Sequence, residues 1–181
     1  ILTALGVEPV LLLTGPETNF QPSPEALDRV EGELDGLIVA SPSNPTGTII
    51  HSDKFKELIE YCDAKEIRLI SDEIYHGITF GEKAETALAF TGNAIVVNSF
   101  SKYFSMTGWR LGWMILPEDM LRAAECLAQN LFISPPTLSQ HAAVAAFDCR
   151  DELDANVAAY AKSRALLLEE LPKAGFDKLA P

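Results

Sequence analysis

One stretch of the chain sets a lysine among hydroxyl groups and follows it, eight residues later, with an arginine. The lysine is Lys102, the serines beside it are Ser99 and Ser101, and the arginine is Arg110. An unprotonated lysine amine is a nucleophile that forms imines with aldehydes. A planar arginine fork and serine hydroxyls donate hydrogen bonds that suit a phosphate. These residue types predict a covalent hold on an aldehyde cofactor beside a phosphate site.

Each member of this stretch also has an ordinary explanation. Taken alone, Lys102 would be a surface lysine, although the apolar strand before it and the aromatic residues around it argue against simple exposure. Arg110 could equally form a salt bridge with a carboxylate at the edge of the core. The stretch by itself leaves both explanations of the arginine open.

Two more polar clusters occur upstream of the lysine. Asn44, in Ser-Asn-Pro-Thr-Gly, could be only a turn residue, since Asn, Pro and Gly are typical turn formers. Asp72 follows a predicted buried strand, where an ionised carboxylate needs a cationic or strongly donating partner. A protonated pyridine nitrogen is one such partner, and the alternative is that Asp72 caps a short helix beginning near Ile74. Tyr75 could donate to a phenolate oxygen or keep its hydroxyl in water, and Glu73 could be exposed.

Apolar runs of strand length alternate with amphipathic segments of helical length. The predicted strands are Val10–Leu13, Leu37–Ala40, Ile67–Ile70, Ala94–Asn98 and Trp109–Leu116. The predicted helices are Pro24–Glu31, a helix capped by Ser52 with Phe55, Leu58, Ile59 and Cys62 on one face, a helix opened by Pro117, Thr137–Phe147, and a long helix from Leu153 to Leu171 that Pro172 ends.

This order of elements predicts an α/β domain with a mostly parallel sheet covered by helices on both faces. In such sheets, ligands bind at the carboxyl ends of the strands. Each of the three polar clusters directly follows a predicted strand. We therefore expect the three clusters to converge on one bound molecule.

The composition limits the partners of the chain. At 181 residues and 48% hydrophobic content, it is long enough for one compact domain. A formal net charge of −12 disfavours nucleic acid and anionic membranes, and no apolar run reaches the roughly 18 residues of a membrane span. The histidines and cysteines lack the spacing of a metal site, so no metal is expected, and the cysteines are expected to be reduced thiols of a cytoplasmic protein; these residues are His51, His76, His141, Cys62, Cys126 and Cys149.

Together, the clusters closely resemble the aminotransferases of class I and II, the fold type I enzymes that use pyridoxal 5'-phosphate. The resemblance covers essentially the whole chain, through Ser-Asn-Pro-Thr-Gly at 43–47, Ser-Asp-Glu-Ile-Tyr at 71–75, Ser-Phe-Ser-Lys at 99–102 and Gly-Trp-Arg-Leu-Gly at 108–112. It implies that Lys102 is the catalytic lysine that forms an imine with the cofactor. It implies that Asp72 pairs with the pyridinium nitrogen.

The resemblance assigns the remaining cofactor contacts as well. Asn44 and Tyr75 would bind the phenolic oxygen of the ring, and the Asn44–Pro45 peptide bond would be cis. The phosphate would be held by Ser99, Ser101 and Arg110.

An activity and an assembly follow from the same resemblance. The expected function is transfer of an amino group between an amino acid and a 2-oxo acid by a homodimer. Residues 1–181 would be the central part of the cofactor-binding large domain, a three-layer sandwich, without the N-terminal segment and the C-terminal small domain. Such a piece would be inactive alone. The alternatives are a carbon–sulfur lyase of the same fold and an aminotransferase-like sensor domain of a transcription regulator.

Overall fold

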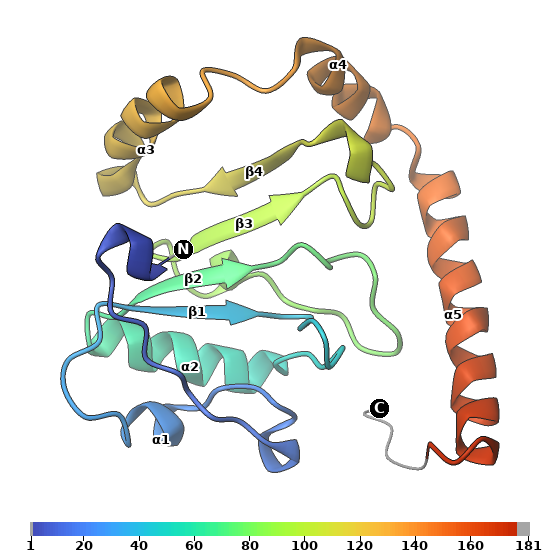
Figure 1. Cartoon of the computed structure of the whole chain (residues 1–181), viewed down its shortest axis with the longest axis horizontal. Helices are drawn as coiled ribbons and strands as arrows, with labels where there is room; N and C mark the ends of the chain where they lie inside the picture. Colours follow the sequence, from blue (N-terminus) through green and yellow to red (C-terminus); the bar gives the residue numbers. More distant parts are fainter. Residues whose placement is uncertain (1, 177–181) are drawn as a thin grey trace.

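A four-stranded sheet forms the centre of the computed structural model, which describes residues 2–176 (Figure 1). The strands β1 (Gly36–Ala40), β2 (Arg68–Asp72) and β3 (Ile95–Ser99) are parallel neighbours, and β4 (Gly112–Ile115) joins β3 in the antiparallel direction. The helices are α1 (Pro24–Leu27), α2 (Ser52–Ala64), α3 (Glu118–Leu131), α4 (Thr137–Ala146) and α5 (Arg150–Lys173). A mostly parallel sheet flanked by helices confirms the predicted α/β fold class.

Helix α2 and the sheet enclose the main hydrophobic core. The predicted apolar face of α2 is confirmed, because Phe55, Leu58, Ile59 and Cys62 are each 1% exposed. They pack with Val39, Leu69 and Val96 from the facing side of the sheet. Burying a side chain of this size contributes about 1.5–3 kcal/mol, so this layer fixes the strands that carry the polar clusters. The opposite face of the sheet is more open within residues 2–176, since Ile38 is 56% and Met114 57% exposed.

Three predictions about the first half of the chain are wrong. Residues 10–13 form no strand and pair with none within the described range, and Leu11 and Leu13 are 87% and 91% exposed. The first helix ends at Leu27, after which the chain turns and reaches Gly32 at φ +94, a conformation that glycine adopts without steric cost. Ser52 does not cap α2, because it is already the first helical residue.

The second half of the chain follows the predicted order more closely. Pro117 lies one residue before α3 rather than inside it, and Pro172 lies in the last turn of α5, which ends one residue later. The last strand begins at Gly112 instead of Trp109, because Arg110 has a left-handed backbone with φ 52 that a strand cannot contain. A Cβ on Gly112 would lie 2.7 Å from the carbonyl oxygen of Asn98, so this close approach of β3 and β4 requires glycine.

The direction of the strands places the polar loops at one edge of the sheet. In Figure 1 the arrowheads of β1, β2 and β3 point towards the side on which α5 lies, whereas β4 points away from it. The loops after the three parallel strands therefore share an edge, as predicted. None of the helices between residues 2 and 176 has the length and apolar composition needed to cross a bilayer.

Candidate functional site

The three polar clusters leave the sheet side by side. The β1–β2 ladder continues past β1, because the backbone N–H of Ser41 donates to the carbonyl of Asp72 at 3.2 Å. The N–H of Glu73 likewise donates to Val97 of β3 at 2.8 Å. These bonds fix the relative positions of the loop at 41–50, the turn at 72–77 and the loop at 100–111. The predicted convergence of the clusters on one edge is thus present in the fold.

Asn44 and Tyr75 meet across two of these loops. The Asn44 amide Nδ2 lies 3.4 Å from the Tyr75 hydroxyl, with the asparagine exposed and the tyrosine half-buried. The Asn44–Pro45 peptide bond is cis, as the resemblance implied. The loop is closed by the Ser43 N–H, which donates to the Thr48 carbonyl at 2.9 Å, and by the Gly47 N–H, which donates to Ser43 at 2.7 Å. Two side chains that can donate hydrogen bonds, from the loops after β1 and β2, therefore lie close enough to reach one shared acceptor.

Lys102 approaches the same place from the loop after β3. Its Nζ lies 5.5 Å from the centroid of the Tyr75 ring, and no carboxylate within residues 2–176 forms a salt bridge with it. The lysine is half-buried. Its loop is anchored because Phe100 exchanges backbone hydrogen bonds with Leu111 and Met106 and is itself only 6% exposed. The prediction that this lysine is not a freely solvated surface residue is consistent with this position.

Ser99, Ser101 and Arg110 lie on either side of the junction between β3 and β4. The Ser99 hydroxyl lies 3.0 Å from the Ser101 hydroxyl, accepts from the Ser101 N–H at 3.0 Å and donates to the Leu111 carbonyl at 3.2 Å. Arg110 is exposed and donates to the Thr107 carbonyl at 3.1 Å. Within the described chain its guanidinium has no carboxylate partner, so the salt-bridge alternative finds no support there.

Asp72 ends β2 and is half-buried. One carboxylate oxygen accepts from the Ile74 N–H at 3.1 Å, so the capping contact is present, although residues 74–77 form a turn and not the short helix that this alternative expected. The other oxygen accepts no hydrogen bond from residues 2–176 and remains able to bind a cation. A capping role and a cofactor contact are therefore compatible in this side chain.

Glu73 differs from the expectation that it could be exposed, because only 2% of its surface is exposed. Its Oε1 accepts from the Ser71 hydroxyl at 3.1 Å, the Thr86 hydroxyl at 3.1 Å and the Ala87 N–H at 2.8 Å. The alternation of the strand could have revealed this burial: Leu69, Ser71 and Glu73 lie two residues apart and so point to the same buried face.

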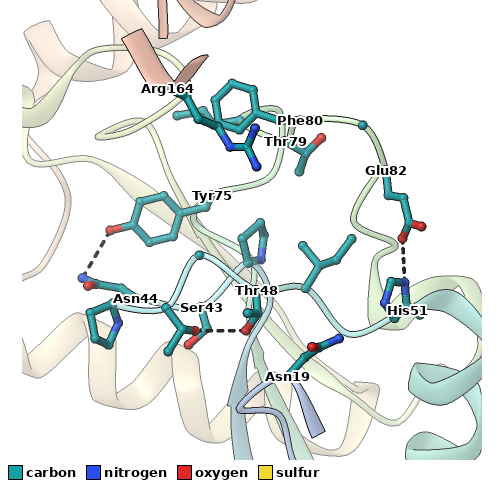
Figure 2. Close-up of a pocket in the computed structure, with 17 residues that line it drawn as sticks. Asn19, Ser43, Asn44, Thr48, His51, Tyr75, Thr79, Phe80, Glu82 and Arg164 are labelled. Carbon is teal, nitrogen blue, oxygen red and sulfur yellow. Dashed lines mark hydrogen bonds and ion pairs between the residues drawn. The ribbon is translucent and has the colours of Figure 1, made fainter. Parts of the chain in front are cut away.

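A cavity of about 610 Å³ lies beside this site, and Figure 2 shows the residues that line it. Asn44 and Tyr75 form one wall, and the opposite wall carries His51, whose Nδ1 lies 2.6 Å from Glu82 Oε2. Arg164 reaches the cavity from α5, and its guanidinium carbon lies 5.6 Å from the centroid of the Phe80 ring. The lysine, aspartate, serines and arginine of the predicted site do not line this cavity. It meets that site only at Asn44 and Tyr75, and no sequence pattern pointed to Arg164.

Comparison with known proteins decides the family. The family model for aminotransferase class I and II matches residues 1–181. The chain belongs to this family. Within the class I and II aminotransferases it is 49% identical, over its whole length, to a valine–pyruvate aminotransferase of Mycobacterium tuberculosis, of which it covers 48%. It is 38% identical to a (5-formylfuran-3-yl)methyl phosphate transaminase of Methanocaldococcus jannaschii, over 78% of this chain and 38% of that protein.

Solved aminotransferases share the fold. A crystal structure of an aminotransferase from Mycobacterium tuberculosis matches 99% of this chain with a TM-score of 0.95 and 49% identity. The match covers 48% of that structure's chain. The sheet, the helices and the fold type I architecture described above are therefore those of the aminotransferase family. The chain spans about half the length of the valine–pyruvate aminotransferase and less than half the length of the furan phosphate transaminase.

Proposed function

We propose that this chain carries the pyridoxal 5'-phosphate site of an aminotransferase that moves an amino group between an amino acid and a 2-oxo acid. The contact that supports this most directly is the meeting of Asn44, Tyr75 and Lys102 at the carboxyl edge of the sheet. It places an amide, a phenol and an amine around one space. The names of the relatives, all transaminases, point in the same direction.

The donor set fits the cofactor group by group. Lys102, which has no described salt-bridge partner, would hold the cofactor aldehyde covalently. Asn44 and Tyr75 would donate to the phenolic oxygen, since their own contact at 3.4 Å leaves room for a shared acceptor. The free oxygen of Asp72 would keep the ring nitrogen protonated.

The phosphate would lie at the other end of the site. The Ser99 and Ser101 hydroxyls stand 3.0 Å apart, and the guanidinium of Arg110 carries a charge that no described carboxylate neutralises. A charged fork and two hydroxyls complement a phosphate dianion. When bound, the cofactor supplies an electron sink for the bond broken at the substrate's alpha carbon. The amino group of the substrate would displace the Lys102 amine from the cofactor aldehyde, and the released amine would then take the proton from that carbon.

The substrates follow only at the level of chemical class. Relatives of this chain are named for substrates as different as valine with pyruvate and a furan phosphate. The pair valine and pyruvate is the first to assay, because that relative is 49% identical. Keto acid formed only in the presence of an amino acceptor supports transamination. Pyruvate, ammonia or sulfide released without an acceptor would instead indicate elimination.

Borohydride reduction tests the cofactor assignment directly. The intact protein is incubated with pyridoxal 5'-phosphate, reduced, digested and mapped by peptide mass spectrometry. The expected result is one pyridoxyl adduct on the peptide that contains Lys102. Reduction without an adduct there, or an adduct mainly on another lysine, would contradict the proposal.

The expectations about assembly and context belong to the same proposal. Residues 1–181 would form part of the large domain of a cytoplasmic homodimer. Exposed apolar side chains on and between α3 and α4 support a buried interface: Leu131 is 76%, Ile133 81% and Leu138 72% exposed. The three free cysteines agree with a reducing compartment. Light scattering of the intact protein should give twice the mass of one chain, and a monomer mass would exclude the dimer.

A further inference from the structure

The loops that carry Asn44 and Tyr75 are joined by a second side chain that the proposed chemistry does not use. His76, the residue after Tyr75, places its Nε2 3.1 Å from the carbonyl oxygen of Ser41. Ser41 is the first residue after β1 and lies three residues before Asn44. Since a carbonyl only accepts, Nε2 must carry the proton and donate. The histidine therefore ties the tyrosine turn to the base of the asparagine loop.

A buried carboxylate lies beside the other ring nitrogen of this histidine. Oε2 of Glu73 lies 3.4 Å from Nδ1 of His76, and the side chains are 3% and 20% exposed. The other oxygen of Glu73 already accepts three hydrogen bonds, from Ser71, Thr86 and Ala87. A carboxylate held by so many donors cannot reorient cheaply, because any move leaves buried groups unpaired. When Nδ1 also carries a proton, the imidazole is held between this fixed carboxylate and the backbone carbonyl of Ser41.

Ser41, which accepts the hydrogen bond from His76, is also held in place. The Ser41 hydroxyl accepts from the Ile50 N–H at 2.9 Å, which joins the two ends of the loop. Ser41 is 2% exposed. A shift of the Tyr75 turn relative to Ser41 would therefore have to break the histidine bond or move the whole loop base. The distance between Asn44 and Tyr75 depends on both loops and so on this tie.

We propose that His76, oriented by Glu73, is a positioning residue that keeps the Asn44 amide and the Tyr75 hydroxyl aimed at one acceptor. This inference rests on the proposed function, in which that acceptor is the phenolic oxygen of pyridoxal 5'-phosphate. Neither His76 nor Glu73 touches the acceptor. Small errors in the placement of donors are costly in such sites, so a residue that sets the spacing of two loops affects the cofactor without contacting it.

Two substitutions of His76 separate the effect of its hydrogen bond to Ser41 from the effect of its side-chain volume. His76→Leu removes the donor, while His76→Gln keeps a side-chain N–H that can reach the Ser41 carbonyl. His141→Leu is the matched control, because His141 is an exposed histidine on α4. Each variant of the intact protein is titrated with pyridoxal 5'-phosphate, and the pH midpoint of the visible absorption change of the bound cofactor is recorded.

The expected result is a graded loss. His76→Leu should weaken cofactor binding by about fivefold, the equivalent of one hydrogen bond. It should also move the spectral midpoint to higher pH by about 0.5 unit or more, because weaker donors stabilise the anionic oxygen less. His76→Gln should restore most of both values, and Glu73→Gln should shift them in the same direction as His76→Leu. His141→Leu should leave them unchanged.

A double-mutant cycle with Asn44→Ala tests whether the histidine acts through the asparagine. In that background, His76→Leu should change cofactor binding by less than about twofold, since the positioned amide is already missing. An undiminished effect in that background, or a loss of thermal stability with no spectral shift, would overturn the inference. If the intact protein binds no cofactor at all, both the proposed function and the positioning role of His76 are wrong. If cofactor binds normally and His76→Leu matches the unaltered protein, only the positioning role fails.

Discussion

Lys102 Nζ lies 5.5 Å from the centroid of the Tyr75 ring, so an amine from the loop after β3 faces a phenol from the turn after β2. A cation over an aromatic face gains about 0.5–1 kcal/mol at an accessible site, which is enough to orient the ammonium but not to lock it. No described carboxylate competes for it. The lysine is therefore held near the donors while remaining free to react.

Replacing the lysine should abolish the chemistry while sparing the fold. Lys102→Ala removes the amine that faces the Tyr75 ring, so we expect kcat for transamination to fall by about 10²–10⁴-fold, the range of a lost acid–base group. The reduced cofactor adduct should disappear as well. Lys83→Ala, at an exposed lysine, is the control and should keep both. A Lys102→Ala protein with near-normal turnover would contradict the assigned role.

Asp72→Asn separates the two roles of the aspartate. The asparagine oxygen can still accept from the Ile74 N–H, now 3.1 Å from the carboxylate, so the turn and the thermal midpoint should change little. The negative charge is lost, and with it the stabilisation of a protonated ring nitrogen. We expect kcat to fall by about 10²-fold or more, as for other preorganised electrostatic groups. A large loss of stability at unchanged kcat would instead show that capping is the main role.

Arg110→Gln should weaken the phosphate end of the site. A charge-assisted hydrogen bond contributes about 1.5–3 kcal/mol, so the dissociation constant of pyridoxal 5'-phosphate should rise by about 10-fold or more. Pyridoxal, which lacks the phosphate, should bind the variant about as well as the unaltered protein. Arg122→Gln on α3 is the control, since the side chain of that arginine is 82% exposed and its salt bridge is to Glu125 on the same helix. Equal losses for both ligands would rule out a phosphate contact.

The sequence predicted best those features that short segments determine by themselves. The buried face of α2 follows from apolar residues at helical spacing, and β1 to β3 follow from continuous apolar runs between turn residues. The same local information misled at residues 10–13, where an apolar run has a strand-like pattern but no strand to pair with in the described chain. Pairing is a property of the neighbours and cannot be read from the segment.

The candidate site divides in the same way. The seven predicted residues lie at the last position of a parallel strand or in the loop after it, and the strand order brings these positions to one edge. Their roles towards the cofactor remain predictions. The cavity contact of Arg164 was beyond sequence reasoning because α5 supplies it from a distant part of the chain. The tie between His76 and Ser41 was missed for the same reason, since it joins residues 35 apart in sequence.

The thiol of Cys62 predicts how the fold responds to alkali. Burial, with a smaller contribution from the charge of Asp63, raises the pKa of this thiol from 9.0 to about 11. Because the folded state binds the proton more tightly than the unfolded chain, the resulting stability is complete below pH 9 and is lost as the pH rises to about 11. Urea denaturation should therefore show a steeper fall in stability across this window than in Cys62→Ala. That variant pays only a constant cost for its cavity, and Cys126→Ala, at a half-buried cysteine, should follow the unaltered protein. Parallel curves for the unaltered protein and Cys62→Ala would show that the buried thiol does not govern the alkaline response.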